Sequence, residues 1–391
     1  MLLLAACATP VPDSGQAAHT GQTADTAMES CPQGEAFFEP AEGELQRWVL
    51  DGVEGSPATR VLDEPGTLRI CAGTSFSRLL ISADVQVEGA GAGADQTVLS
   101  GGGYGPVVEV LAGSLALSGI SVVDGVAEHG GGIRCDANAS VSLNDVVLAD
   151  NRATSGGGLS ASGCRVELVG TVVRGNDASS HGGGLVVNGA ELTVRSSSFS
   201  GNSAGLDGGG LGIQQADATL EGTDFDQNDA GDHGGGLHVV EGGVVLRQVR
   251  FSTNTASEDG GAVSVTGGSV LSLDEAALEG NTAQYGGAIY GDSSSSLDVS
   301  ASTFLDNVGT VQGGAVYLLW ASTASLEDLT LAGNASAMGG ALYLDPDSTA
   351  EGAACSFSDN APDDVAADGR GSYTWAESTS FVCDLDGCST P

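Results

Sequence analysis

A glycine-rich motif returns nine times along this chain at an almost fixed spacing. Each copy reads Gly-Gly-Gly or Gly-Gly-Ala followed by an aliphatic residue, as in HGGGL at 181–185 and DGGAV at 259–263. The aliphatic residues lie 26 residues apart, with one step of 27, at Ile133, Leu159, Leu185, Leu211, Leu237, Val263, Ile289, Val316 and Leu342. Self-similarity with a period of about 20–50 residues marks a solenoid, in which each unit stacks on the next.

Two further positions repeat in register with the glycine motif. An asparagine precedes eight of the nine motifs by five or six residues, and an apolar residue, often phenylalanine, precedes each asparagine by three. The asparagines are Asn151, Asn176, Asn202, Asn228, Asn254, Asn281, Asn307 and Asn334; Asn360 extends the series, and Asp124 is expected to take the place at its front. We expect the apolar residues to fill the core. The asparagines are expected to adopt the left-handed backbone conformation at a turn and to bond to one another as a ladder.

The segments between these positions predict short strands. Runs such as GLVV, ELTV and SSFS between 184 and 200 alternate apolar and polar residues, and none is long enough for a helix. We therefore predict an all-β parallel β-helix with three short strands per coil and roughly eleven coils, about 50 Å long. The helix is assigned to 66–360, with an N-terminal cap at 31–65 and a C-terminal cap at 361–391, because open solenoid ends expose core and unpaired strands.

The repeat also resembles a known pattern. The pairing of F-x-x-N with G-G-A-[ILV], as in FSTNTASEDGGAV at 251–263, is similar to the repeat of chlamydial polymorphic outer membrane proteins. More broadly, 66–360 resembles right-handed β-helix proteins of the pectin-lyase-like superfamily. The resemblance implies a right-handed helix, display at the cell surface and a role in adhesion. Because the superfamily also contains polysaccharide lyases and glycoside hydrolases, it leaves a carbohydrate-active enzyme as the alternative.

The first residues predict attachment to a membrane. Leu4-Ala5-Ala6-Cys7 resembles the lipobox of bacterial lipoproteins, in which the cysteine is lipidated. We interpret 1–7 as the remnant of a lipoprotein signal, Cys7 as the lipidation site and 8–30 as a flexible tether. These features predict a protein held at the outer membrane or cell surface, with the membrane as a partner through the lipid.

Charge narrows the range of partners. The chain has 51 acidic and 12 basic residues, all of them arginine, for a formal net charge of −39. Such a surface repels phosphate backbones, so nucleic acid is excluded as a partner, and it attracts divalent cations. The absence of lysine fits a GC-rich genome equally well.

The cysteines suggest disulfides in an oxidising compartment. Seven remain after Cys7, and an odd number leaves at least one unpaired. The candidate pairs are Cys31 with Cys71, Cys135 with Cys164 and Cys383 with Cys388, which leaves Cys355 over, although the sequence does not determine the connectivity. CDLDGC at 383–388 is weakly similar to a calcium loop and is interpreted as a small disulfide-closed turn.

The residue that precedes each glycine motif is a candidate metal ligand. Stacking places His181, Asp207, His233 and Asp259 on successive coils about 4.8 Å apart. Alternating imidazole and carboxylate groups could bind zinc or another divalent cation, or titrate together near neutral pH. The competing interpretation is an exposed turn position that accepts any polar residue, which Gln312 and Met338 in the same column support.

No catalytic set of the polygalacturonase or pectate-lyase type is identified. The chain has no lysine for an R-x-K motif, and Asp363-Asp364 is interpreted as an isolated, solvated turn. We therefore favour a non-catalytic rod that binds a polysaccharide or a surface protein, or that supports the envelope, with no cofactor other than a candidate zinc or calcium ion. A carbohydrate-active enzyme instead requires aromatic and acidic residues from neighbouring coils on one strand face. The exposed aromatic residues expected from the sequence are Tyr285, Tyr290, Tyr317 and Trp320, although Tyr290 and Tyr317 could instead continue one packed column.

Overall fold

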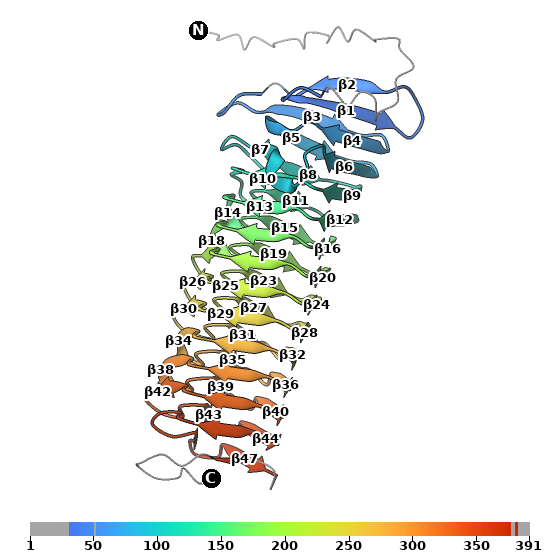
Figure 1. The fold of residues 1–391 in the computed structure, drawn as a ribbon. Coiled ribbons are helices and arrows are strands. Elements are labelled where there is room, and N and C mark those ends of the chain that lie inside the picture. The colour runs from blue at the N-terminus through green and yellow to red at the C-terminus, as the bar shows by residue number, and fades with distance from the viewer. Residues whose placement is uncertain (1–30, 51, 377–379, 382–391) are drawn as a thin grey trace, which may run out of the picture.

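The structure, a computed structural model, describes residues 31–50, 52–376 and 380–381. Over these residues the chain winds into a right-handed parallel β-helix with strands stacked along one axis (Figure 1). The only helical element described is the 3-10 turn η1 (Ala94–Gln96). No helix in the described part of the chain is long and apolar enough to cross a membrane.

The strands fall into four parallel ladders, here called sheets 1 to 4 in the order in which each turn visits them. Sheet 1 contains β3 (Ala58–Leu62), β5 (Gly73–Ile81), β8 (Val108–Val110), β11 (Ile133–Cys135), β15 (Leu159–Ser162), β19 (Leu185–Asn188), β23 (Leu211–Gln214), β27 (Leu237–Val240), β31 (Val263–Thr266), β35 (Ile289–Gly291), β39 (Val316–Leu318), β43 (Leu342–Leu344) and β46 (Val365–Ala367). Sheet 3 shares β5 and adds β7 (Thr97–Ser100), β10 (Ser121–Val123), β13 (Val147–Ala149), β17 (Val172–Arg174), β21 (Ser198–Ser200), β25 (Asp224–Asp226), β29 (Arg250–Ser252), β33 (Ala277–Glu279), β37 (Thr303–Leu305), β41 (Thr330–Ala332), β45 (Ser356–Ser358) and β48 (Ser380–Phe381).

Sheet 2 lies between sheets 1 and 3 along the chain, and each turn contributes one strand to it. Its parallel strands are β4 (Gly66–Ile70), β6 (Val85–Gly89), β9 (Gly113–Ser118), β12 (Ala139–Asn144), β16 (Arg165–Val169), β20 (Glu191–Arg195), β24 (Asp217–Glu221), β28 (Gly243–Arg247), β32 (Val270–Asp274), β36 (Ser296–Ser300), β40 (Thr323–Glu327), β44 (Thr349–Ala353) and β47 (Ser372–Trp375). These thirteen strands delimit twelve turns, close to the expected eleven coils. The antiparallel hairpin of β1 (Glu35–Pro40) and β2 (Gln46–Val49) pairs with β4 and covers the N-terminal end.

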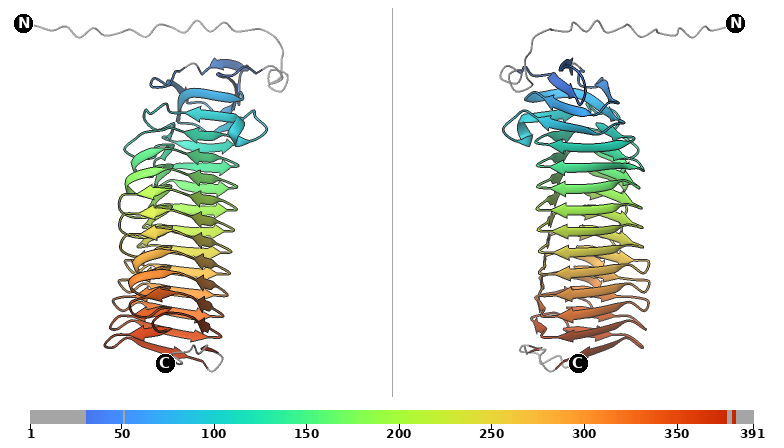
Figure 2. Two further views of the ribbon diagram at one scale, coloured as in Figure 1. Left: turned by 60° about the vertical axis from the view of Figure 1, so that its left-hand side comes forward. Right: turned by 90° about the vertical axis from the view of Figure 1, so that its right-hand side faces the viewer.

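Sheet 4 adds a fourth, short strand to the three per coil expected from the sequence. It contains β14 (Arg152–Ser155), β18 (Asp177–His181), β22 (Ser203–Ala204), β26 (Asp229–Ala230), β30 (Thr255–Ala256), β34 (Thr282–Tyr285), β38 (Val308–Gln312) and β42 (Ala335–Ser336). These strands directly follow the asparagine positions. Figure 2 shows the strands of successive turns lying one beneath another along the whole rod.

Stacked apolar side chains fill the interior. Consecutive phenylalanines of the repeat share one column, and the ring centroids of Phe199 and Phe225 and of Phe225 and Phe251 are both 4.7 Å apart. All three are fully buried. Because the repeat places one such residue in every turn, a single continuous core runs the length of the rod.

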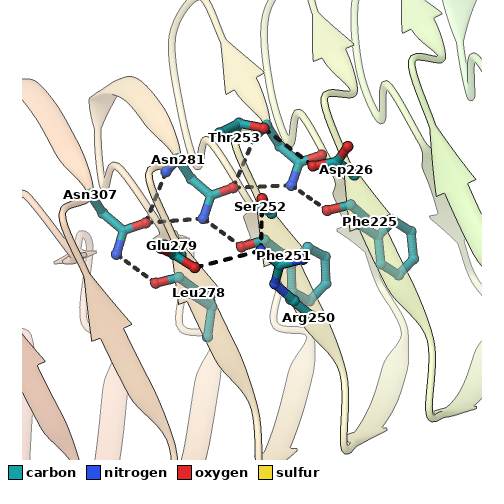
Figure 3. A network of polar contacts seen from close by, with 11 residues as sticks. Phe225, Asp226, Arg250, Phe251, Ser252, Thr253, Leu278, Glu279, Asn281 and Asn307 are labelled. Atoms are coloured by element: carbon teal, nitrogen blue, oxygen red, sulfur yellow. Dashed lines mark hydrogen bonds and ion pairs between the residues drawn. The ribbon is translucent and has the colours of Figure 1, made fainter.

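The asparagines form a buried ladder beside this core (Figure 3). The Nδ2 group of Asn281 donates to the carbonyl oxygen of Phe251 and to Oδ1 of Asn307, each at 3.0 Å. The backbone N–H of Asn281 also donates to the same Oδ1. The ladder ends where Asn360 donates to Asp364, which is only 4% exposed, so the interpretation of Asp363-Asp364 as a solvated turn is wrong for Asp364.

Two details of the ladder correct the sequence analysis. The left-handed conformation belongs to the residue before each asparagine, for example Gln227 and Thr253, because the asparagine itself must turn its amide inward. Strand pairing also aligns Asp124 with Asp150 and not with Asn151. Gly125 holds the front of the ladder and donates its N–H to Asn151 Oδ1 at 2.9 Å. A Cβ atom on Gly125 would lie 1.8 Å from the carbonyl oxygen of Gly131, so no asparagine fits there.

The glycine motif permits close stacking of the turns. In the turn that contains Gly234 and Gly235, the first has a φ of 66°. A Cβ atom on the second would lie 2.4 Å from the carbonyl oxygen of Gly261 in the next turn. Gly234 is therefore required because of its left-handed backbone conformation, and Gly235 because the next turn leaves no space for a side chain.

Parallel pairing extends beyond the helix range of 66–360. β3 already pairs in parallel with β5, and β46 and β47 pair in parallel with β43 and β44. Two of the candidate cysteine pairs are disulfides, Cys31–Cys71 at the N-terminal hairpin and Cys135–Cys164 between neighbouring turns. Cys355 is a buried free thiol, and its burial raises its pKa. Cys7, the tether at 8–30 and the pair Cys383 and Cys388 lie outside the described residues.

Candidate functional site

The column of residues that precede the glycine motifs lies at the junction of sheets 4 and 1. His181 ends β18, and Asp259 forms parallel bridges to His233 on one side and Tyr285 on the other. Two close contacts join the alternating groups. Nδ1 of His181 lies 3.0 Å from a carboxylate oxygen of Asp207, and Nδ1 of His233 lies 3.0 Å from one of Asp259. The four residues predicted from the sequence thus lie in one column as two matching pairs.

Burial and neighbouring charges shift the pKa values of Asp207 and His233 in opposite directions. Burial raises the pKa of Asp207, although the neighbouring His233 and His181 oppose that shift. The contact with the Asp259 carboxylate raises the pKa of His233, and burial partly offsets it. A raised His233 pKa favours its cationic form near neutral pH when no other cation is present.

A second layer of side chains lies beneath this column on the outer face of sheet 1. His238 on β27 is 8% exposed, and its ring stacks on that of His233 with centroids 5.8 Å apart. Burial, with the charges of His233 and His181, lowers the pKa of His238 to about 3. Its Nδ1 atom is buried and has no hydrogen-bond partner. His238 is therefore neutral across the physiological pH range.

The tyrosines of the same layer do not form an exposed platform. Tyr290, Tyr317 and Tyr343 are each 5% exposed, because their rings stack on one another at 5.5 and 5.4 Å. Tyr285 from the outer column covers Tyr317 at 5.4 Å. The alternative of a packed column is therefore confirmed for Tyr290 and Tyr317, and of the four aromatic residues only Trp320 is largely exposed, at 64%.

One residue that the sequence analysis missed joins the second histidine pair. Glu258 Oε2 lies 4.0 Å from Nε2 of His233. His233, Glu258 and Asp259 each offer one potential metal-ligand atom, and these atoms lie within 4.8 Å of one another. His181 and Asp207 do not belong to this cluster. The repeat pattern did not single out Glu258, because it lies one position before the column of residues that precede the glycine motifs.

A separate groove of about 670 Å³ lies near the N-terminal end, on the outer face of sheet 3. Its floor is formed by outward-facing side chains of β5, β7 and β10, including Phe76, Val98 and Val123. Its rim contains Glu54, Asp124, Asp150, Arg152 and Asp177. The volume falls within the range of about 300–1,000 Å³ typical of ligand sites.

Irregular segments of the first turns build the walls of this groove. The segment around Glu54 reaches sheet 3 through a bridge between Gly52 and Phe76, and Gly55 donates its N–H to Gly102. On the other side, the groove is bordered by the first strands of sheet 4, β14 and β18. The groove therefore lies where the irregular opening turns meet the regular repeat.

The rim carboxylates are not equivalent. Asp124 accepts a hydrogen bond from the Ser100 hydroxyl at 3.0 Å, and Asp177 forms an ion pair with Arg152 at 2.9 Å. Asp150 lies 3.8 Å from Arg174. Four acidic residues against one lining arginine leave the groove with a negative charge. No repeat pattern indicated this site, because it combines residues of the irregular opening turns with residues of the regular repeat.

Comparison with known proteins agrees with the fold. A family model described as a right handed beta helix region matches residues 131–304. No curated protein matches the chain. Among solved structures, the chain is similar to the catalytic unit of a thermostable GH87 alpha-1,3-glucanase from Streptomyces thermodiastaticus strain HF3-3. That match has 12% identity and a TM-score of 0.31, and it covers 97% of this chain and 71% of that one.

Proposed function

We propose that this protein is a non-catalytic binding rod of the bacterial cell surface, whose lateral groove holds a segment of a neutral or cationic glycan. The supporting observation is the groove itself, with an apolar floor at Phe76, Val98 and Val123 and carboxylates from successive turns at its rim. Carboxylates accept hydrogen bonds from hydroxyl or ammonium groups, and the floor can cover the apolar face of a sugar ring.

The negative charge of the protein determines which glycans the groove is proposed to bind. The net charge of −39 and the acidic rim disfavour polyuronates and other polyanions at low ionic strength. A neutral or amino-substituted polymer avoids this repulsion. The groove is therefore proposed to prefer such polymers over acidic ones.

The proposed location rests on separate features. The lipobox-like Leu4-Ala5-Ala6-Cys7 supports a lipid anchor at the outer membrane, and the F-x-x-N repeat resembles that of surface-displayed proteins. The two disulfides fit an oxidising, extracytoplasmic compartment. A rod held at one end would present its groove to ligands outside the cell, which suits adhesion.

A carbohydrate-active enzyme is the second candidate. It is favoured by the same rim, because carboxylates from neighbouring turns line one groove and glycosidases use a pair of carboxylates that flank the scissile bond. Against it, Asp177 is paired with Arg152 and Asp124 is engaged by Ser100, whereas a general acid must present a protonated carboxyl to the leaving oxygen.

Binding and turnover measurements on the full chain distinguish the two candidates. We expect binding to neutral glucans or chitosan, weaker binding to polygalacturonate, and no release of reducing ends or unsaturated products. Phe76→Ala and Asp150→Asn should each weaken binding by about tenfold, the effect of losing roughly 1.4 kcal/mol. Asp306→Asn is the matched control, because Asp306 has the same left-handed conformation as Asp150, φ 53° against 57°, but lies outside the groove.

The turnover result tests whether the protein is an enzyme, and the binding result tests whether the groove is the binding site. Turnover that disappears in Asp124→Asn or Asp177→Asn would establish the enzyme. Binding that is equal in Phe76→Ala and in the Asp306→Asn control would show that the groove is not the binding site.

A further inference from the structure

We propose that His233, Glu258 and Asp259 form a site for one divalent transition-metal ion of the zinc type, independent of the groove. An imidazole nitrogen and two carboxylate oxygens are ligands that such ions accept, and the three candidate donor atoms lie within 4.8 Å of one another. Around a tetrahedral ion with bonds of about 2.1 Å, donors lie about 3.4 Å apart. Asp259 contacts Nδ1 of His233 and Glu258 lies 4.0 Å from Nε2, so the exposed Glu258 side chain has to move toward Nδ1 for one ion to bind all three residues.

The solenoid holds two of the ligands in place before any ion arrives. Asp259 and His233 lie on adjacent turns joined by a parallel bridge, and the N–H of Gly234 donates to the Asp259 carbonyl at 2.8 Å. The N–H of Glu258 donates to the carbonyl of Asp232 at 2.9 Å. The Asp259 side chain is only 14% exposed, so its carboxylate has little freedom to move. Binding therefore requires little ordering of the backbone.

A second observation independently points to a ligand at this place. His238 packs against the inner face of the His233 ring, and its Nδ1 atom is buried without a partner. This stacking orients the His233 ring, as outer-sphere contacts do at metal sites.

The His181–Asp207 pair provides a comparison for the proposed metal site within the same protein. His181 and Asp207 form the same 3.0 Å contact two turns earlier, but Leu206 stands where Glu258 stands. That pair offers two ligands instead of three, so we expect one bound ion per chain and not two. Calcium is disfavoured because it prefers all-oxygen coordination.

The test is calorimetric titration of the metal-free full chain with ZnCl₂ at about pH 7.5, above the ordinary histidine pKa of about 6.5. Cobalt(II) titrated in parallel reports coordination geometry through its visible spectrum. We expect one zinc equivalent that excess calcium does not displace. Glu258→Leu and His233→Ala should weaken it by about tenfold or more, a loss of at least 1.4 kcal/mol. His181→Ala should leave it unchanged.

A gain-of-function variant makes the test sharper. Leu206→Glu gives the first pair the missing carboxylate and should raise the stoichiometry from one zinc to two. Leu206 and Glu258 are both exposed, so neither substitution disturbs the core, and circular dichroism checks the fold of each variant. No zinc binding by the wild type, or binding that Glu258→Leu and His233→Ala leave unchanged, would overturn the proposal. The groove experiment is unaffected by either result.

Discussion

Replacing Asn254 by alanine tests how much the asparagine ladder stabilises the rod. The Asn254 side chain is fully buried and takes part in four hydrogen bonds. It donates to Phe225 O and Asn281 Oδ1, each at 3.0 Å, and accepts from the N–H and the Nδ2 group of Asn228, at 3.0 and 2.9 Å. Two of these partners keep another bond, because Asn228 Nδ2 also donates to Phe199 O and Asn281 Oδ1 also accepts from the backbone of residue 254.

The backbone N–H of Asn228 is the group that loses its acceptor. Leaving a buried donor without a partner costs about 1–3 kcal/mol, and each other lost bond contributes about 0.5–1.5 kcal/mol. The desolvation cost of the Asn254 amide disappears with it, so these values are not additive. We expect the free energy of unfolding to fall by about 3 kcal/mol.

Urea unfolding followed by circular dichroism measures this loss, and hydrogen exchange locates it. Because each turn contacts only its neighbours, faster exchange should be confined to the turns around residues 225–281. Thr255→Ala is the control, since Thr255 is exposed in the same turn and should change stability by less than about 0.5 kcal/mol. A loss for Asn254→Ala no larger than that of the control would refute the stabilising role of the ladder.

Three further predictions follow from the fold. Thr253→Gly should stabilise the protein by about 0.5–1 kcal/mol in urea unfolding, because Thr253 has a φ of 52° that favours glycine; a loss of stability would contradict this. Replacing both Cys135 and Cys164 by alanine should cost about 3–4 kcal/mol, from the entropy of a loop spanning 29 residues, and an unchanged urea midpoint would argue that stacking alone restricts the chain. Burial lowers the pKa of His238 to about 3 in the folded protein, whereas an unfolded histidine has a pKa of about 6.5. The contribution of neutral His238 to the free energy of unfolding is therefore complete above about pH 6.5. Below that pH it is lost at about 1.4 kcal/mol per pH unit. His238→Gln should remove that slope, and equal slopes for both proteins between about pH 6.5 and 5 would contradict it.

The period of the repeat could be predicted from the sequence because it is a local property. Every turn places a glycine motif, an asparagine and an apolar residue at the same offsets, so the stacked phenylalanines and the parallel pairing with a 26-residue step follow from a one-dimensional pattern. The pattern did not reveal which residue of each turn adopts the left-handed conformation. Ladder geometry decides that, since the amide of Asn254 has to point inward and the preceding Thr253 has to turn the chain.

The candidate sites depended on contacts between turns that no single repeat contains. The column of His181, Asp207, His233 and Asp259 was visible in the sequence, but only the structure divides it into two pairs and adds Glu258 to one of them. The groove was not visible, because its floor and rim combine Glu54, Phe76 and Asp124 with residues up to Asp177. The stacking could be predicted from the repeat alone, because neighbouring turns carry the same kinds of side chain at a fixed separation in the chain. The sites depend on the folded structure, because the groove forms where irregular turns meet the repeat and the metal-ligand cluster forms where Glu258 lies beside His233 of the preceding turn.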